Sequence, residues 1–235
     1  MTRRYLLVDD NAAFVENLAE ILQDTGATVD VAADAEAALE QLERARYDVL
    51  VTDMKMPGMS GTELLHRARR ADPALPVVLL SAYVQDGQLS DARREGLLAV
   101  LSKPGKVPQL VGVLEKARRG GMVLLVEDDA ALAENLSDAL SARGLTVCTA
   151  STASELEQVD VQPFAALVDL RLPGCPTGEP LARVRERFPG TPTVVITGVT
   201  DASVPADAEL YKKPFDTRAL VDRLEQLFAR VGAAP

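Results

Sequence analysis

The sequence predicts two α/β domains in tandem, each a doubly wound parallel sheet of five strands flanked by helices. Three observations lead to this fold class. Four short segments recur in the same order with a period near 116 residues. Within each copy, short apolar runs alternate with amphipathic stretches, as strands alternate with helices in α/β proteins. The apolar runs hold consecutive apolar residues, which indicates strands buried on both faces of a parallel sheet.

The repeats define the domain organisation. Residues 5–11 recur as 123–129, 48–58 as 164–174, 76–81 as 192–197, and 102–104 as 212–214. A period of this length is that of a whole domain and is too long for a solenoid repeat. We therefore predict one domain over residues 1–119 and a second over 122–235, joined by the linker Gly120-Gly121. So short a linker predicts a fairly fixed pairing of the two domains.

The elements of the first copy follow from its apolar pattern. The predicted strands cover residues 3–8, 27–32, 48–53, 76–81 and 98–102. Helical spacing falls between or after them, at Phe14, Leu18, Ile21 and Leu22, at Leu64, Leu65 and Ala68, and at Leu110, Val113, Leu114 and Ala117. The last helix is predicted to end near Arg118-Arg119, with the glycines of the linker as its stop signal.

The second copy follows the first up to its fourth strand and then becomes shorter. The first copy has 22 residues from Ser81 to Lys103, whereas the second has 16 from Thr197 to Lys213. Residues 198–207 lack helical periodicity and contain Pro205, which a helix interior does not favour. We predict a loop or a single turn there, so that the fourth helix of the second domain is short or missing.

Composition and charge exclude several classes of function. The net charge is −10, with 15 basic against 18 acidic residues up to Gly120 and 10 against 17 beyond it. Neither half has a basic excess, which disfavours direct DNA binding. No apolar run reaches the roughly 18 residues of a membrane helix, and the N-terminal segment is not a signal peptide. Cys148 and Cys175 lack metal-type spacing, so we expect a cytoplasmic protein with reduced thiols and no membrane association.

Chemically useful side chains stand at the carboxyl ends of the predicted strands, where open parallel sheets bind their ligands. They are Asp9, Asp10, Asp53, Ser81 and Lys103 in the first copy, and Glu127, Asp128, Asp169, Thr197 and Lys213 in the second. Three clustered carboxylates repel one another, and a hard divalent cation such as Mg²⁺ offsets that repulsion. A lysine and a hydroxyl suit phosphoryl oxygens, and the central aspartate is then the nucleophile that forms an acyl phosphate.

Each of these residues taken alone has a plainer explanation. An aspartate after a strand is usually a helix cap or a turn residue, and a Lys-Pro pair is usually a loop. The conjunction argues against that explanation, because four strand ends carry compatible groups in both copies. The separation from acceptor aspartate to hydroxyl is also 28 residues in each copy.

This set of residues resembles the receiver (CheY-like) domain of bacterial two-component response regulators. The matching segments are 8–10, 53–58, 81–82 and 103–104, and in the second copy 126–128, 169–174, 197–198 and 213–214. The resemblance covers nearly the whole chain. It implies a flavodoxin-like fold that receives a phosphoryl group from a phosphohistidine on a sensor histidine kinase or a histidine phosphotransfer protein.

The resemblance also assigns a role to each residue. It makes Asp53 and Asp169 the phosphoacceptors, which hold Mg²⁺ together with Asp9 and Asp10 or with Glu127 and Asp128. Ser81 and Thr197 would swing toward the phosphoryl group, and Lys103 and Lys213 would neutralise it. The implied protein is a stand-alone double receiver of a phosphorelay and not an enzyme with an external substrate. Its output would pass through contacts with a downstream protein, because no DNA-binding or enzymatic segment follows the second copy.

Two departures from the family pattern separate the copies from a typical receiver. The family often places an aromatic residue three positions before the fifth-strand lysine, where this sequence has Val100 and Leu210. Tyr211 is one position away and should face the other side of its strand. The trimmed fourth-helix region leaves open that the second domain is a pseudoreceiver used for dimerisation or partner binding. Formation of a homodimer is left open as well.

Other functional classes fit the sequence less well. A phosphohydrolase of the haloacid dehalogenase type also uses an aspartate nucleophile with Mg²⁺, but it needs an Asp-x-Asp pair at one strand end. A nucleotide- or flavin-binding domain needs a first loop rich in glycine or hydroxyl residues, whereas residues 9–12 are Asp-Asp-Asn-Ala. The single histidine, His66, lies among arginines on a predicted helix and is not a convincing phosphodonor.

Overall fold

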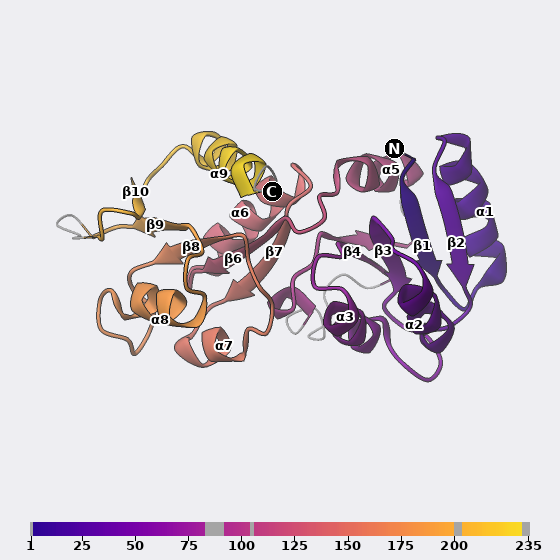
Figure 1. Ribbon diagram of the computed structural model, residues 1–235, viewed down its shortest axis with the longest axis horizontal. Coiled ribbons are helices and arrows are strands. Elements are labelled where there is room, and N and C mark those ends of the chain that lie inside the picture. The colour runs from indigo at the N-terminus through magenta and orange to yellow at the C-terminus, as the bar shows by residue number, and fades with distance from the viewer. Residues whose placement is uncertain (1, 83–91, 104–105, 200–203, 232–235) are drawn as a thin grey trace. The chain divides into compact units, whose positions relative to one another are not determined.

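The computed structural model describes residues 2–82, 92–103, 106–199 and 204–231, and the chain divides into two compact units, 1–120 and 121–235. Each unit is a five-stranded, all-parallel sheet with helices on both faces (Figure 1). In the part of the chain that is described, no helix combines the length and the apolar character needed to cross a bilayer. The predicted fold class, two flavodoxin-like α/β domains in tandem, is therefore confirmed.

Unit one has the strand order β2-β1-β3-β4-β5. Its elements are β1 (Arg4–Val8), α1 (Ala12–Asp24), β2 (Thr28–Ala32), α2 (Ala35–Arg44), β3 (Val49–Asp53), α3 (Gly61–Ala71), β4 (Val77–Ser81), β5 (Ala99–Ser102) and α5 (Val107–Lys116). Residues 92–94, just before β5, are also helical. The strands lie within one residue of the predicted ranges. The order reverses beside β1, which places the switch point of the sheet between β1 and β3.

Unit two repeats this topology, with the strand order β7-β6-β8-β9-β10. Its elements are β6 (Met122–Val126), α6 (Ala130–Ser141), β7 (Thr146–Ala150), α7 (Ala153–Gln158), β8 (Ala165–Asp169), α8 (Glu179–Arg187), β9 (Thr193–Thr197), β10 (Glu209–Lys212) and α9 (Thr217–Val231). Between β9 and β10, the described residues 198–199 and 204–208 contain no helix. The amide of Ala208 donates to the carbonyl of Pro205 at 2.9 Å and closes a turn, as the missing periodicity predicted.

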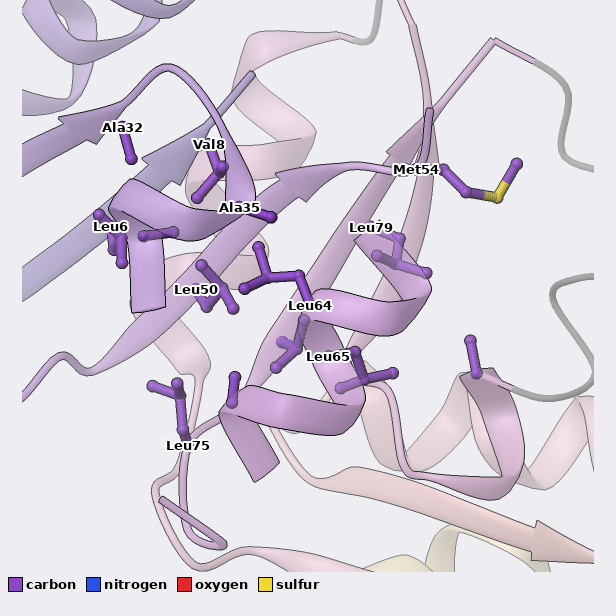
Figure 2. Packing of buried hydrophobic residues seen from close by; sticks show 14 of the residues in the cluster. Leu6, Val8, Ala32, Ala35, Leu50, Met54, Leu64, Leu65, Leu75 and Leu79 are labelled. Atoms are coloured by element: carbon purple, nitrogen blue, oxygen red, sulfur yellow. The ribbon is translucent and has the colours of Figure 1, made fainter. Parts of the chain in front are cut away.

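Each sheet is the middle layer of its unit and carries an apolar core on both faces. In unit one, α2 and α3 cover one face while α1 and α5 cover the other. Figure 2 shows the first of these cores, in which Leu6, Leu50 and Leu79 of the strands pack with Leu64 and Leu65 of α3. The consecutive apolar residues of β1, β3 and β4 therefore alternate between two cores, which fixes the register of these strands.

The end of α5 differs from the prediction. The helix stops at Lys116, and the next residue, Ala117, has extended backbone geometry, so the linker glycines do not act as its stop. The guanidinium of Arg3 donates to the carbonyls of Glu115 and Ala117 at 2.8 and 2.7 Å. These bonds satisfy carbonyls that the helix end leaves without intrahelical partners, a role that sequence periodicity cannot reveal.

A capping box begins α3, the helix that follows β3. The amide of Glu63 donates to Oγ of Ser60 at 3.3 Å, and the amide of Ser60 donates to Oε2 of Glu63 at 2.9 Å. The same bond from Ser60 lowers the pKa of Glu63. The two reciprocal bonds satisfy two amides that the first turn of the helix leaves unpaired.

We expect the substitution Ser60→Ala to lower the free energy of unfolding of unit one by about 1 kcal/mol, because it removes the side-chain half of this box. Urea unfolding followed by tyrosine fluorescence measures the change, since Tyr5, Tyr47 and Tyr83 precede the linker. Glu63→Gln keeps an acceptor at the same place and should cost less. An unfolding midpoint that Ser60→Ala leaves unchanged would contradict the prediction.

Candidate functional site

The register of unit one brings its acidic strand ends together. Val8 of β1 is paired with Thr52 of β3, so the residues that follow them, Asp9 and Asp53, lie at neighbouring strand ends. Asp9 is buried, and Asp53 is partly buried. Asp10 points to solvent as the exposed member of the group.

The next two strands contribute a hydroxyl and a lysine. Ser81 at the end of β4 is paired with Ser102 of β5, and the amide of Lys103 donates to the carbonyl of Ser81 at 2.8 Å. The side chain of Lys103 then reaches back across the edge of the sheet. Its Nζ lies 2.7 Å from Oδ2 of Asp53 and also contacts Oδ2 of Asp9. One cation thus bridges two carboxylates and offsets their mutual repulsion.

Unit two builds the same bridge from its own strands. Val126 is paired with Val168, so Glu127 and Asp169 follow at neighbouring strand ends. Nζ of Lys213 lies 2.7 Å from Oε2 of Glu127 and 2.6 Å from Oδ2 of Asp169. Both carboxylates are buried here. The longer glutamate side chain therefore reaches the same lysine position that Asp9 reaches in unit one.

Burial and hydrogen bonding shift the pKa values of Glu127 and Lys213 in opposite directions. Burial raises the pKa of Glu127, and the hydrogen bond from Lys213 lowers it without cancelling the effect of burial. Burial acts to lower the pKa of Lys213, but the hydrogen bonds to Asp169 and Glu127 outweigh it and leave that pKa raised. The lysine therefore remains a cation at neutral pH, and its positive charge lies against both buried side chains.

Three carboxylates at each sheet edge could hold a metal ion. Asp9, Asp10 and Asp53 offer oxygen atoms that all lie within 4.8 Å of one another, and so do Glu127, Asp128 and Asp169. Both sets contain only oxygen donors, which suits a hard divalent cation and not a thiophilic one. The exposed aspartate of each set leaves one side open to water.

The hydroxyls of Ser81 and Thr197 follow the strand residues that pair with Asp53 and Asp169, and both have interaction partners. Ser81 and Thr197 are both buried at the ends of β4 and β9. Oγ1 of Thr197 accepts a hydrogen bond from the amide of Val199 at 3.2 Å. The structure therefore gathers every predicted side chain of unit one at the carboxyl end of its sheet. Every predicted side chain of unit two lies at the carboxyl end of its own sheet. Pro104, part of the sequence motif, lies outside the described residues.

Comparison with known proteins decides the family. A family model described as the response regulator receiver domain matches residues 5–115. A response regulator receiver protein of Anaeromyxobacter sp. (strain Fw109-5) is 48% identical over 231 residues, which span 98% of this chain and 97% of that protein. This chain belongs to the response regulator receiver proteins. Such proteins are components of two-component systems and signal through phosphorylated aspartate.

More distant relatives match single domains. Sporulation initiation phosphotransferase F of Bacillus subtilis is 28% identical over 116 residues, which span 49% of this chain and 94% of that protein. A CheY-like receiver domain protein of Methanospirillum hungatei JF-1, known as a crystal structure, is 28% identical with a TM-score of 0.48 and spans 49% of this chain. Its chain is covered to 92%. Receiver domains take their phosphoryl groups from histidine kinases or phosphotransfer proteins.

Sequence reasoning missed one feature of the two sites, the backbone amides that hold Asp53 and Asp169. The amide of Lys55 donates to Oδ1 of Asp53 at 3.2 Å, and the amide of Arg171 donates to Oδ1 of Asp169 at 3.0 Å. In both units this carboxylate is thus held at one oxygen by the loop and at the other by the lysine. An aspartate that bonds the backbone two residues on is a common turn signal, so the pattern was available in the sequence.

The fifth strands confirm the prediction about side-chain direction. Val100 packs on the face covered by α2 and α3, and Leu210 packs on the equivalent face of unit two, covered by α7 and α8. Tyr211 packs on the opposite face, against the core that α6 and α9 cover. Neither receiver has an aromatic side chain at the position where the family often has one.

Proposed function

We propose that this chain is a double receiver of a phosphorelay, with one phosphoacceptor in each domain, Asp53 and Asp169. The observation that carries the proposal is the duplicated bridge, in which one lysine contacts both the acceptor and a buried acidic neighbour. A purely structural repeat has no need to keep this charge arrangement twice. We place the first receiver at residues 1–119 and the second at 122–235, with Gly120-Gly121 as the linker.

In this proposal the chain's own residues prepare the acceptor for in-line transfer. The amide of Lys55 keeps Oδ1 of Asp53 in place, which leaves Oδ2 as the atom that attacks phosphorus. As the new O–P bond forms, the P–N bond to the donor histidine breaks and its electron pair returns to the imidazole. Lys103 then moves from the carboxylate to a phosphoryl oxygen, to which Ser81 donates a hydrogen bond.

Asp9, Asp10 and Asp53 fit Mg²⁺ in the first receiver, and Glu127, Asp128 and Asp169 fit it in the second. Mg²⁺, when bound, neutralises phosphoryl charge during the transfer. The chain's part is to supply oxygen ligands from two neighbouring strand ends and to leave the exposed side open to the incoming phosphoryl group. The lysine bridge carries the compensating charge on the other side of the acceptor.

We infer that the donor is a histidine of a sensor kinase or phosphotransfer protein and that output passes to a protein partner. Phosphorylation adds about −1.5 to −2 charges at the sheet edge, enough to change the affinity of a neighbouring surface. The net charge of −10 fits a protein partner better than DNA. The proposed location is the bacterial cytoplasm, where the donors of such relays act.

A second candidate is that the second domain is a pseudoreceiver that serves dimerisation or partner binding. Two observations favour it. Asp169 is more deeply buried than Asp53, and the described residues between β9 and β10 form a turn where the first domain has helical residues before β5. The burial of Asp169 would restrict the access of a phosphodonor. The turn would change the surface through which a partner protein recognises this domain.

Counting added groups by intact mass separates these candidates. We expect incubation with acetyl phosphate and Mg²⁺ to add up to two phosphoryl groups to the native chain and none to the double variant Asp53→Asn, Asp169→Asn. Each single variant should keep one group. The exposed Asp24→Asn serves as the matched control and should behave like the native chain. A single added group that only Asp53→Asn removes would make the second domain a pseudoreceiver, and none at all would refute the proposal.

A further inference from the structure

The ammonium group of Lys103 makes a further contact besides those with Asp9 and Asp53. Its Nζ lies over the ring of Phe14, 4.8 Å from the ring centre. That distance is within the roughly 6 Å at which the negative face of an aromatic ring attracts a cation. The Lys103 side chain is only 19% exposed, so water screens this attraction little. The lysine of unit one is therefore held by two carboxylates and by an aromatic ring.

A short series of contacts fixes the ring in place. The amide of Asn11 donates to Oδ1 of Asp9 at 3.0 Å, and Oδ1 of Asn11 accepts from the amide of Phe14 at 3.1 Å. Asn11 is the N-cap of α1, so this bond fixes the first turn of the helix. The side chain of Phe14 packs on the core that α1 and α5 cover. Asp9 therefore bonds Lys103 through one oxygen and, through Asn11, positions the ring that the same lysine contacts.

Unit two has the same series of contacts without the ring. The amide of Asp129 donates to Oε1 of Glu127 at 3.2 Å, and Oδ1 of Asp129 accepts from the amide of Leu132 at 3.1 Å. Leu132 stands where unit one has Phe14, five residues after the first carboxylate in both copies. A leucine side chain has no ring face to attract a cation, so Leu132 cannot give Lys213 this contact.

We propose that Phe14 is a positioning residue of the first receiver, whose ring holds the Lys103 ammonium where the phosphoryl group arrives. This role rests on the proposed function, in which Asp53 is the acceptor and Lys103 moves to a phosphoryl oxygen. The attraction of a ring face does not require the donor geometry of a hydrogen bond, so the ammonium can turn while it stays over the ring. Mg²⁺ would share the carboxylates with the lysine, but it binds oxygen ligands and not the ring. The hold of the ring therefore persists when that of the carboxylates weakens.

The position of the ammonium can be tested without a phosphodonor, by NMR of the unphosphorylated full chain. Protons over a ring face resonate upfield, so the Lys103 ammonium protons, assigned through Lys103→Arg, should move downfield in Phe14→Leu. Phe14→Tyr keeps the ring and should keep the upfield position. Phe14→Leu introduces the residue of the second copy, which its helix and core accommodate. Leu22→Val, about two turns further along α1 in the same core, is the matched control and should leave the resonance unchanged.

The role in transfer is measured as the rate at which acetyl phosphate with Mg²⁺ phosphorylates Asp53, in an Asp169→Asn background that leaves one acceptor to count. We expect Phe14→Leu to slow this reaction roughly fivefold. That factor corresponds to about 1 kcal/mol, between the values of exposed and of desolvated cation–π contacts. Phe14→Tyr should keep the native rate, and so should Leu22→Val.

A fluorinated ring separates attraction from packing. Replacing Phe14 by 3,4,5-trifluorophenylalanine keeps the ring and its apolar surface but withdraws the negative charge from its face. Transfer to Asp53 should then slow as it does in Phe14→Leu, because the attraction for the ammonium depends on that charge. A purely structural role of Phe14 would leave the rate of the fluorinated chain unchanged.

Three results would overturn the proposal. One is a Lys103 resonance that stays in place in Phe14→Leu, and another is a native rate of transfer in that variant although the resonance moves. The third is a native rate in the fluorinated chain. If the native chain accepts no phosphoryl group at Asp53, the proposed function fails and this role fails with it. The resonance then still shows separately whether the ring holds the lysine.

Discussion

Gly61→Ala is expected to destabilise unit one by about 2–3 kcal/mol, although it replaces a helix glycine by the best helix former. Gly61 opens α3, and its amide donates to the carbonyl of Met54 at 3.1 Å. A Cβ built on Gly61 would lie 2.1 Å from the backbone oxygen of Asp53, far inside van der Waals contact. The obstacle is backbone, which no side-chain rotation relieves, so either α3 or the acceptor loop must shift.

The φ angle of Gly61 is not in the left-handed region, so the expected loss is steric and not conformational. Gly112 in α5 is the matched control, because a Cβ there meets nothing within 4 Å. Gly112→Ala should raise the stability by up to about 1 kcal/mol through helix propensity alone. Urea unfolding gives both values. Equal changes in the free energy of unfolding for the two variants would show that α3 can shift at little cost, and they would contradict the steric argument.

Much of the fold could be predicted because β1, β3 and β4 are apolar on consecutive residues and α1, α3 and α5 keep their amphipathic spacing. The shortened segment after β9 was predictable for the same reason, since Pro205 and the missing periodicity left no helical pattern. The end of α5 was not predictable. Local sequence favoured a glycine stop, but the helix ends earlier, where Arg3, just before β1, donates to the carbonyls of Glu115 and Ala117. Contacts between segments far apart in sequence decide such ends.

The site could be predicted to the level of residue identity and no further. The carboxyl ends of parallel strands lie at one end of the sheet, so Asp9, Asp53 and Lys103 were expected at that end once the strands were assigned. The sequence did not show which carboxylates the lysine contacts. It also did not show that Glu127 is buried with a raised pKa, because burial depends on how neighbouring strands and loops cover the side chain.

Removing the lysine of the second receiver should have the next largest effect. In Mg²⁺-free buffer at neutral pH, we expect Lys213→Ala to lower the free energy of unfolding by about 2–3 kcal/mol, because it leaves two buried carboxylates without a cation. The side chains of Glu127 and Asp169 are only 1% and 9% exposed. The figure is below that for a fully buried pair, since 25% of the Lys213 side chain reaches solvent. Urea unfolding followed by circular dichroism measures the loss.

The pH dependence of that loss has a definite sign. Lys213 lowers the pKa of Glu127 against the effect of burial, so its removal raises that pKa further above the value in the unfolded chain. A carboxyl group with a raised pKa binds more protons in the folded state than in the unfolded state, so its ionisation destabilises the fold as the pH rises. The difference between Lys213→Ala and the native chain should therefore be large at pH 7 and shrink as the pH falls. A difference that stays constant with pH would exclude Glu127 as its source.

Magnesium supplies a second check on the same argument. If Lys213 offsets the clustered negative charge in the unphosphorylated domain, a bound divalent cation should supply part of the positive charge that Lys213→Ala removes. Saturating Mg²⁺, at about 100 times its Kd, stabilises a binding-competent fold by about 2.7 kcal/mol. We expect Mg²⁺ to stabilise Lys213→Ala more than it stabilises the native chain, because no ammonium group opposes the incoming ion.

Lys212→Ala, which changes the exposed lysine next to it, should show neither the loss of stability nor the larger gain with Mg²⁺. Equal magnesium effects in Lys213→Ala and the native chain would mean that the lysine and the metal do not share these carboxylates.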